Sequence, residues 1–167
     1  MKKKIAVIDE YLKSLMSLYF KDNVDVLLYE NISEVDADIL LLNNYYGQIP
    51  AEIFKKVTVL NLHPALLPAF ANSDALIQAY TSGVKVSGVT VHYVEKDNFY
   101  GKIIAQYPLI ISSDMHYNEY VEALTSIGNK LYPPVASAVL NDKVFDFSEI
   151  FKHKCSASCS SCSGCKK

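Results

Sequence analysis

The sequence predicts an α/β fold in which an open, mostly parallel, twisted sheet is flanked by helices. In the first half of the chain, short apolar runs alternate with amphipathic segments, which is typical of parallel strands joined by crossover connections. The run at 38–42 is continuously apolar, as expected of a strand covered on both faces. In the second half, the long apolar stretches 86–94 and 103–111 are separated by a short loop, which favours an antiparallel pair at a sheet edge.

The elements follow in order from these patterns. Buried strands are expected at 5–8, 24–29, 38–42 and 57–62. The first is followed by an amphipathic helix whose apolar positions are Leu12, Leu15, Met16 and Tyr19. A short helix is expected from Pro50, because proline is favoured in a first turn.

Two further helices are expected in the second half. One covers 74–81, and the other starts with Asp114 as its cap and runs to Leu140. Pro133 and Pro134 fall inside the second helix and are predicted to kink or split it. We expect residues 1–150 to form one α/β domain and residues 151–167, rich in Ser, Cys and Lys, to form a flexible or metal-binding tail.

Composition narrows the classes of function. Half of the 167 residues are hydrophobic and the formal net charge is −2, so no nucleic-acid or membrane partner is indicated. The apolar run after Lys2–Lys4 is too short for a signal peptide, and a cytoplasmic location is therefore expected. The chain contains no arginine, so a phosphate or carboxylate cannot be held by a planar two-pronged clamp.

The segment Asn61–Pro68 is the main candidate for chemistry. Asn61 and His63 lie at the carboxyl end of a predicted parallel strand, where open α/β sheets place their ligand crevices. Residues two apart on a strand point to the same face, so both side chains could address one atom. A capped turn with a hydrogen-bonded histidine is the alternative interpretation.

The order of several motifs resembles that of the folate-dependent formyltransferases, which include glycinamide ribonucleotide and methionyl-tRNA formyltransferases. The match starts with Asn61-Leu62-His63-Pro64-Ala65-Leu66-Leu67-Pro68. Further matching positions are Gln78-Ala79, Gly83, Gly88 to His92, Gly101 to Gln106 and Lys130 to Val135. This resemblance implies a formyltransferase or Rossmann-like fold.

The resemblance also implies a reaction. In this family an amine attacks the formyl carbon of 10-formyltetrahydrofolate, the co-substrate, and an oxyanion develops. Asn61 and a protonated His63 would each donate a hydrogen bond to that oxygen. The loop that contains Asn44, Tyr45, Tyr46, Gly47 and Ile49 occupies the place of the family's pterin-binding loop.

The sequence departs from the family at the catalytic carboxylate, whose position is Phe99 here. Asp97 is a candidate replacement, and Glu95 lies in the same loop; a solvated loop acid is the alternative interpretation. Loss of a general acid or base typically costs about 10²–10⁴ in rate. The place of the substrate-phosphate loop reads Ile8-Asp9-Glu10-Tyr11, which has no glycine and two acids. Glycinamide ribonucleotide is therefore not the expected acceptor.

Four cysteines, Cys155, Cys159, Cys162 and Cys165, crowd into the last residues with His153 nearby. Their spacing could hold one centre of zinc, copper(I) or an iron–sulfur cluster. A reduced tail without a metal is the alternative.

Three hypotheses follow from the sequence. The first is an enzyme that transfers a formyl group from 10-formyltetrahydrofolate to a small-molecule amine other than glycinamide ribonucleotide. The second is a family member that binds folate or a similar ligand without turnover, because it lacks the catalytic aspartate. The third is a metal-handling protein that acts through its cysteine-rich tail.

Overall fold

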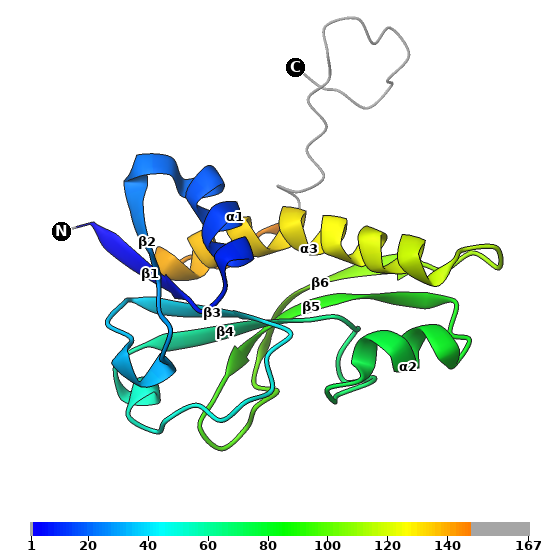
Figure 1. Cartoon of the computed structure of the whole chain (residues 1–167), viewed down its shortest axis with the longest axis horizontal. Coiled ribbons are helices and arrows are strands. Elements are labelled where there is room, and N and C mark those ends of the chain that lie inside the picture. The colour runs from blue at the N-terminus through cyan, green and yellow to red at the C-terminus, as the bar shows by residue number, and fades with distance from the viewer. Residues whose placement is uncertain (1, 148–167) are drawn as a thin grey trace, which may run out of the picture.

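The computed structural model describes residues 2–147 (Figure 1). Its six strands are β1 (Lys3–Val7), β2 (Val24–Leu28), β3 (Ile39–Asn43), β4 (Thr58–His63), β5 (Val86–Val94) and β6 (Ile103–Ile110). Its α-helices are α1 (Glu10–Phe20), α2 (Ala75–Thr81) and α3 (Tyr117–Leu140). Short 3₁₀ turns are η1 (Lys21–Asn23), η2 (Ile32–Glu34) and η3 (Ile53–Lys55).

The strands form one sheet in the order β2-β1-β3-β4-β5-β6. Strands β2, β1, β3 and β4 pair in parallel, whereas β5 is antiparallel to both β4 and β6. The predicted open, mostly parallel sheet with an antiparallel pair is therefore confirmed. The expected strands lie within two residues of the observed ones at every boundary.

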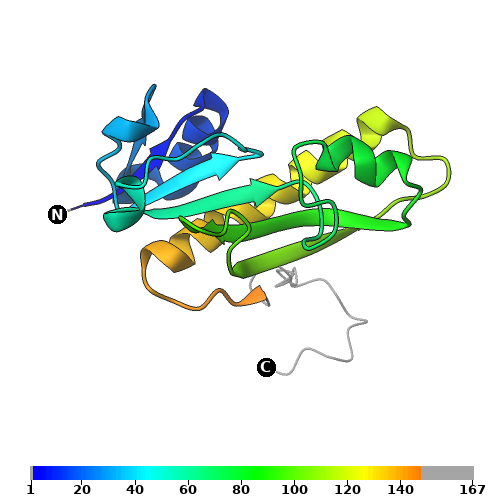
Figure 2. The same cartoon turned by 90° about the horizontal axis from the view of Figure 1, so that it is seen from below.

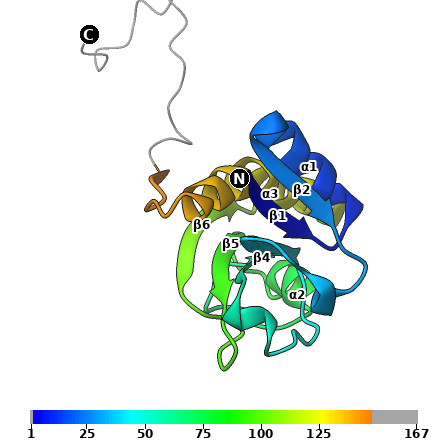
Figure 3. The same ribbon diagram turned by 90° about the vertical axis from the view of Figure 1, so that its left-hand side faces the viewer.

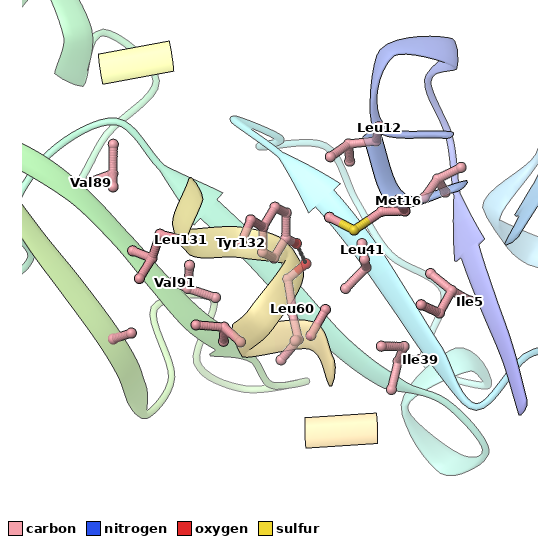
Figure 4. Close-up of a cluster of buried hydrophobic side chains, with 14 of the residues drawn as sticks. Ile5, Leu12, Met16, Ile39, Leu41, Leu60, Val89, Val91, Leu131 and Tyr132 are labelled. Atoms are coloured by element: carbon pink, nitrogen blue, oxygen red, sulfur yellow. Dashed lines mark hydrogen bonds between the residues drawn. The ribbon is translucent and has the colours of Figure 1, made fainter. Parts of the chain in front are cut away.

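The two long helices cover one face of the sheet. Seen end-on, α1 and α3 lie side by side above the strands (Figure 3). Their apolar side chains pack on inward-facing residues of the strands, and the largest buried cluster contains Ile5, Leu12, Met16, Leu41, Leu60 and Leu131 (Figure 4). The side chains of Tyr120, Leu124, Ile127 and Leu131, which follow one another at helical spacing along α3, contribute to this cluster.

The opposite face carries loops and short helical turns in place of a long helix, and α3 lies behind the strands in the view from below (Figure 2). Here a second apolar cluster contains Ala6, Leu40, Leu42, Ile53 and Val59. Towards the carboxyl end of β4, polar side chains replace apolar ones on this face. The candidate site therefore lies on the face without the long helices.

The structure corrects two details of α3. Its N-cap is His116, not Asp114, and the backbone N–H of His116 donates to Glu119 Oε2 at 2.8 Å. The helix runs through Pro133 and Pro134 without being split. Both prolines remove a backbone donor, yet buried side chains on either side of them anchor this part of the helix to the sheet.

Tyr132 is the main anchor of this part of α3. Its side chain is fully buried, and its hydroxyl accepts from the backbone N–H of Leu42 at 3.2 Å. The same hydroxyl is 2.9 Å from the carbonyl oxygen of Leu42 and 3.1 Å from that of Leu60. This hydroxyl therefore links α3 to β3 and β4, and Leu60 directly precedes Asn61 of the candidate site.

No helix within residues 2–147 has the length and apolar character needed to cross a membrane.

Candidate active site

Asn61 and His63 lie on the same face of β4, as predicted, and both are completely buried. Asn61 is opposite His92 in the antiparallel pairing with β5, and His63 is opposite Thr90. Four polar side chains are therefore buried together on the face without the long helices. Buried polar groups of this kind need hydrogen-bond partners, and these partners define the state of the site.

The side-chain amide of Asn61 forms two hydrogen bonds with the loop after β3. Its Oδ1 accepts from the backbone N–H of Tyr45 at 3.3 Å, and its Nδ2 donates to the carbonyl oxygen of Tyr45 at 3.2 Å. Asn44, directly before Tyr45, has a positive φ of 49° that turns the chain into this position. Asn61 therefore holds the loop in place through both ends of its amide.

Both ring nitrogens of His63 also form hydrogen bonds. Its Nε2 lies 3.0 Å from the carbonyl oxygen of Phe70, and its Nδ1 lies 3.0 Å from the hydroxyl of Tyr46. A carbonyl only accepts, so Nε2 carries the hydrogen and Nδ1 accepts from Tyr46. The predicted donor, a protonated imidazole, is not the state that these contacts favour.

Burial also opposes protonation of His63. Desolvation is the main cause; the hydrogen bond to Phe70 partly offsets it, the neighbouring ring of His92 adds to it, and together they lower the pKa of His63 from 6.5 to about 4. Burial likewise raises the pKa of Tyr46 far above its usual range, so that its hydroxyl stays protonated. The imidazole is therefore neutral at pH 7.

His63 belongs to a group of five neighbouring rings that we call the aromatic cluster, which consists of Tyr46, His63, His92, Phe99 and Tyr100. The ring of Tyr46 stacks on that of Phe99 at a centroid distance of 6.0 Å. Tyr100 meets His63 edge-on at 5.6 Å and lies 5.7 Å from His92. Phe99 and Tyr100 precede β6, so the link between β5 and β6 closes the site.

His92 is the member of the aromatic cluster with an unused polar atom. Its Nδ1 donates to the carbonyl oxygen of Tyr93 at 2.9 Å, and its buried Nε2 has no partner among residues 2–147. Burial lowers its pKa as well. His92 therefore lies beside His63 and supports the site through packing.

The structure does not bring Asp97 to His63. Asp97 is exposed in the tight turn between Glu95 and Asn98, whose backbones pair with each other at 3.1 and 3.2 Å. The partners of the His63 ring are Tyr46 and Phe70, and neither is a carboxylate. The position that the resemblance assigns to the catalytic aspartate is filled by the half-buried ring of Phe99.

The proposed pterin loop divides into two parts. Tyr46 turns inward to His63, and the half-buried Ile49 packs on the second apolar cluster. Tyr45 folds over its own loop, where its hydroxyl donates to the carbonyl oxygen of Gln48 at 3.2 Å, and its ring lies so close to Gly47 that a side chain there would overlap it. Asn44 and Gly47 are exposed to solvent at the edge of the site, and the backbone N–H of Asn44 donates to the carbonyl oxygen of Leu62 at 2.9 Å.

The loop after β1 has no place for a phosphate. Asp9 caps α1, and its Oδ1 accepts from the backbone N–H of Leu12 at 2.7 Å. Glu10 follows in the first turn, so the helix terminus is already paired with a carboxylate and flanked by another.

The metal prediction lies outside the described residues, because Cys155, Cys159, Cys162 and Cys165 belong to 148–167. Within residues 2–147, His, Cys, Asp and Glu side chains do not gather in any group of three that could hold an ion.

Several contributors were not predicted from the sequence. Thr90 donates to the carbonyl oxygen of Ala65 at 2.7 Å and accepts from the backbone N–H of Leu67 at 3.0 Å. Gln106 donates to the carbonyl oxygen of Leu67 at 2.8 Å. Together they hold the segment that follows His63 against the sheet. Polar residues inside apolar strands were the sequence signal that could have identified them.

Comparison with known proteins places this geometry in context. The family model described as formyl transferase matches residues 6–136. Phosphoribosylglycinamide formyltransferase of Bacillus subtilis is 40% identical over 82 residues, which cover 49% of this chain and 42% of the relative. Formyltetrahydrofolate deformylase of Haemophilus influenzae is 33% identical over 132 residues, which cover 78% of this chain and 46% of the relative. The chain thus spans less than half the length of these two relatives.

The fold is similar to that of solved formyltransferase structures. The phosphoribosylglycinamide formyltransferase from Anaplasma phagocytophilum superposes with a TM-score of 0.70 at 21% identity, covering 85% of this chain and 88% of that one. A formyltetrahydrofolate deformylase from Pseudomonas syringae gives a TM-score of 0.69 at 20% identity, covering 87% and 67%. At this level of identity, the similarity concerns the fold.

Proposed function

Because the chain belongs to the formyl transferase family, we propose that it binds a folate carrying a one-carbon group and lacks the acid–base machinery for efficient transfer. The observation that carries the proposal is the state of His63. Its imidazole is buried and neutral, both of its nitrogens are paired, and neither partner is a carboxylate.

Transfer of a formyl group needs two things from a site. The oxyanion of the tetrahedral intermediate needs preorganised donors, and the attacking amine needs a group that accepts its proton. Asn61 and His63 carry suitable N–H groups, but these donate to the carbonyl oxygens of Tyr45 and Phe70. Phe99, at the place of the family's carboxylate, cannot accept a proton. Binding is therefore better supported than turnover.

The binding part of the proposal concerns the loop after β3. Its backbone N–H and C=O groups lie at the carboxyl ends of β3 and β4, and Asn61 fixes the loop from below. The exposed residue Asn44, through its side-chain amide, and the exposed backbone of Gly47 offer donors and acceptors to the edge of a pterin ring. Cofactor contacts are accordingly proposed for Asn44, Tyr45, Tyr46, Gly47 and Ile49.

Slow formyl transfer from 10-formyltetrahydrofolate to an amine is the second candidate function. It is favoured by the retention of Asn61 and His63 side by side on one face of β4. Displacement of the carbonyl oxygens of Tyr45 and Phe70 would free both N–H groups for an oxyanion, and the missing base would leave the rate about 10²–10⁴ below that of a complete site. Glycinamide ribonucleotide is disfavoured as acceptor by the carboxylates of Asp9 and Glu10 at the start of α1.

The experiment measures binding and consumption of 10-formyltetrahydrofolate in parallel. Calorimetry with the full chain is expected to give saturable binding, whereas product analysis with water and a panel of amines is expected to give no consumption above the protein-free rate. The matched variants are Asn61→Ala and Asn98→Ala, the latter a control on the exposed turn. Asn61→Ala should weaken binding because the loop loses its anchor.

The outcomes separate the candidates. Consumption of 10-formyltetrahydrofolate that disappears in His63→Ala would establish slow formyl transfer and rule out binding without turnover. Absence of binding at millimolar 10-formyltetrahydrofolate would rule out both candidate functions. The third hypothesis, metal handling, is tested separately by metal analysis of the full chain and of a chain ending at residue 150.

A further inference from the structure

His92 of β5 holds a buried acceptor that its neighbours leave unpaired. The side chain is completely buried, and its Nδ1 lies 2.9 Å from the carbonyl oxygen of Tyr93. A carbonyl only accepts, so Nδ1 carries the hydrogen and Nε2 keeps a bare lone pair. Nε2 has no hydrogen-bond partner within residues 2–147. Burial of an unpaired acceptor costs free energy, which a ligand that donates to Nε2 would recover.

Nε2 faces the aromatic cluster. It belongs to the end of the imidazole that is far from the backbone, and the ring lies on the face of the sheet without the long helices. The ring centroids of Tyr100, Phe99 and His63 are 5.7, 6.2 and 6.4 Å from that of His92. Phe99 has no polar side-chain atom, and the N–H of His63 is directed to the carbonyl oxygen of Phe70. The neighbouring rings of the cluster therefore give Nε2 no donor.

Two rings of the link between β5 and β6, those of Phe99 and Tyr100, are half-buried beside His92. Phe99 stacks on the ring of Tyr46. Tyr100 meets the ring of His63 edge-on. In the described part of the chain, the side chains of Phe99 and Tyr100 make ring contacts and no hydrogen bond. A flat ligand ring makes contacts of the same kind, so it can take the place of either ring next to His92.

The position of His92 on the sheet limits which ligand atom can reach Nε2. His92 lies directly opposite Asn61 in the pairing of β4 with β5, and its ring neighbours that of His63. In 10-formyltetrahydrofolate the formyl group is on N10, and N5 is joined to N10 through a short carbon bridge. A formyl group beside Asn61 and His63 therefore brings N5, with its hydrogen, close to His92.

We propose that His92 Nε2 accepts a hydrogen bond from the N5–H of a tetrahydropterin and thereby selects tetrahydrofolates over dihydrofolates. This role rests on the proposed binding of a folate. In a dihydrofolate, N5 is double-bonded to carbon and presents a lone pair of its own. Two lone pairs that face each other repel, and Nε2 would stay buried without a donor. Burial lowers the pKa of His92, which keeps the imidazole in the neutral form that can accept.

The test compares two ligands that carry the same formyl group and differ in the hydrogenation of the N5–C6 bond. Calorimetry with the full chain measures the dissociation constants of 10-formyltetrahydrofolate and 10-formyldihydrofolate. The tetrahydro form is expected to bind about tenfold more tightly, which is the effect of one buried hydrogen bond.

Two variants and one spectroscopic signal make the result specific. His92→Phe keeps a ring but removes the acceptor, and it should bind the two ligands with constants within about twofold of each other. Asn98→Ala, on the exposed turn, should keep the tenfold preference. Thermal unfolding checks that each variant is folded. In nitrogen-15 NMR of the unmodified chain, 10-formyltetrahydrofolate should move the His92 Nε2 resonance to lower frequency, as expected of a nitrogen that accepts a hydrogen bond, and 10-formyldihydrofolate should not.

The outcomes separate this role from folate binding itself. If neither ligand binds, the proposed function and the role of His92 both fail. If the unmodified chain binds both ligands equally tightly, the role of His92 fails while folate binding stands. A preference that persists in folded His92→Phe comes from the shape of the ligand ring and overturns the role. A His92 Nε2 resonance that 10-formyltetrahydrofolate leaves unchanged overturns it whether or not His92→Phe folds.

Discussion

Acidification should destabilise the protein through His63 well before carboxylates titrate. The folded state keeps this imidazole neutral, with a pKa of about 4 against 6.5 for a solvated one. Between these two values the unfolded chain binds a proton that the folded chain does not, so stability is fully present above pH 6.5 and falls as pH drops towards 4. The difference in pKa corresponds to about 3 kcal/mol. That is a large part of the stability of an ordinary domain.

Urea unfolding followed by circular dichroism at pH values from 7.5 to about 4.5 measures this loss. His63→Gln removes the titrating group while keeping an N–H near Phe70, and it should flatten the pH dependence. His92, whose pKa burial also lowers, contributes in the same direction, so a residual slope is expected in that variant. His116→Gln, which replaces an exposed histidine, serves as the control. A pH dependence identical in His63→Gln and the unmodified chain would refute the reasoning.

Three other predictions concern single side chains. Tyr132→Phe should cost about 1–3 kcal/mol in urea unfolding, because it leaves the buried N–H of Leu42 without its hydroxyl partner; a loss below roughly 0.5 kcal/mol, which is typical of a surface substitution, would contradict this role. Gly88→Ala should cost about 3 kcal/mol, since its Cβ would overlap the carbonyl oxygen of Tyr107, and unchanged thermal unfolding would count against the strand pairing. Phe99→Asp places a carboxylate beside the ring of His92, whose centroid lies 6.2 Å from that of Phe99. The new charge should raise the pKa of His92 in an NMR titration and increase consumption of 10-formyltetrahydrofolate. An unchanged titration curve would mean that the carboxylate points to solvent.

The strands were predicted well because their signal is local. Runs such as Ile39–Leu42 are buried on both faces, and their continuous hydrophobicity marks them regardless of their partners. The start of α3 was harder to predict from the sequence. Asp114 is a good cap by residue type, but hydrogen bonds with Ser112 and its own backbone lower its pKa in the turn before the helix, and His116 caps the helix instead.

The fate of the prolines in α3 shows why local rules fail in a core. Pro133 and Pro134 were expected to kink or split the helix, since each removes a backbone donor. Tyr132 on one side and Val135 on the other are fully buried, and this packing keeps the helix continuous. The strength of that packing depends on strands more than 70 residues earlier in the chain, as the separations of Tyr132 from Leu42 and Leu60 illustrate.

The absence of a carboxylate at Phe99 is an expectation from the resemblance to the family. By itself, the sequence determined the sheet and the placement of Asn61 and His63 on one face of β4. These follow from strand periodicity and from residue identity, which do not depend on distant contacts. Only the tertiary structure decided that His63 is neutral and paired with Tyr46 and Phe70, and that Asp97 lies apart from it. Protonation and pairing depend on burial and on which groups share a buried space, and residues far apart in the sequence create that space when the chain folds.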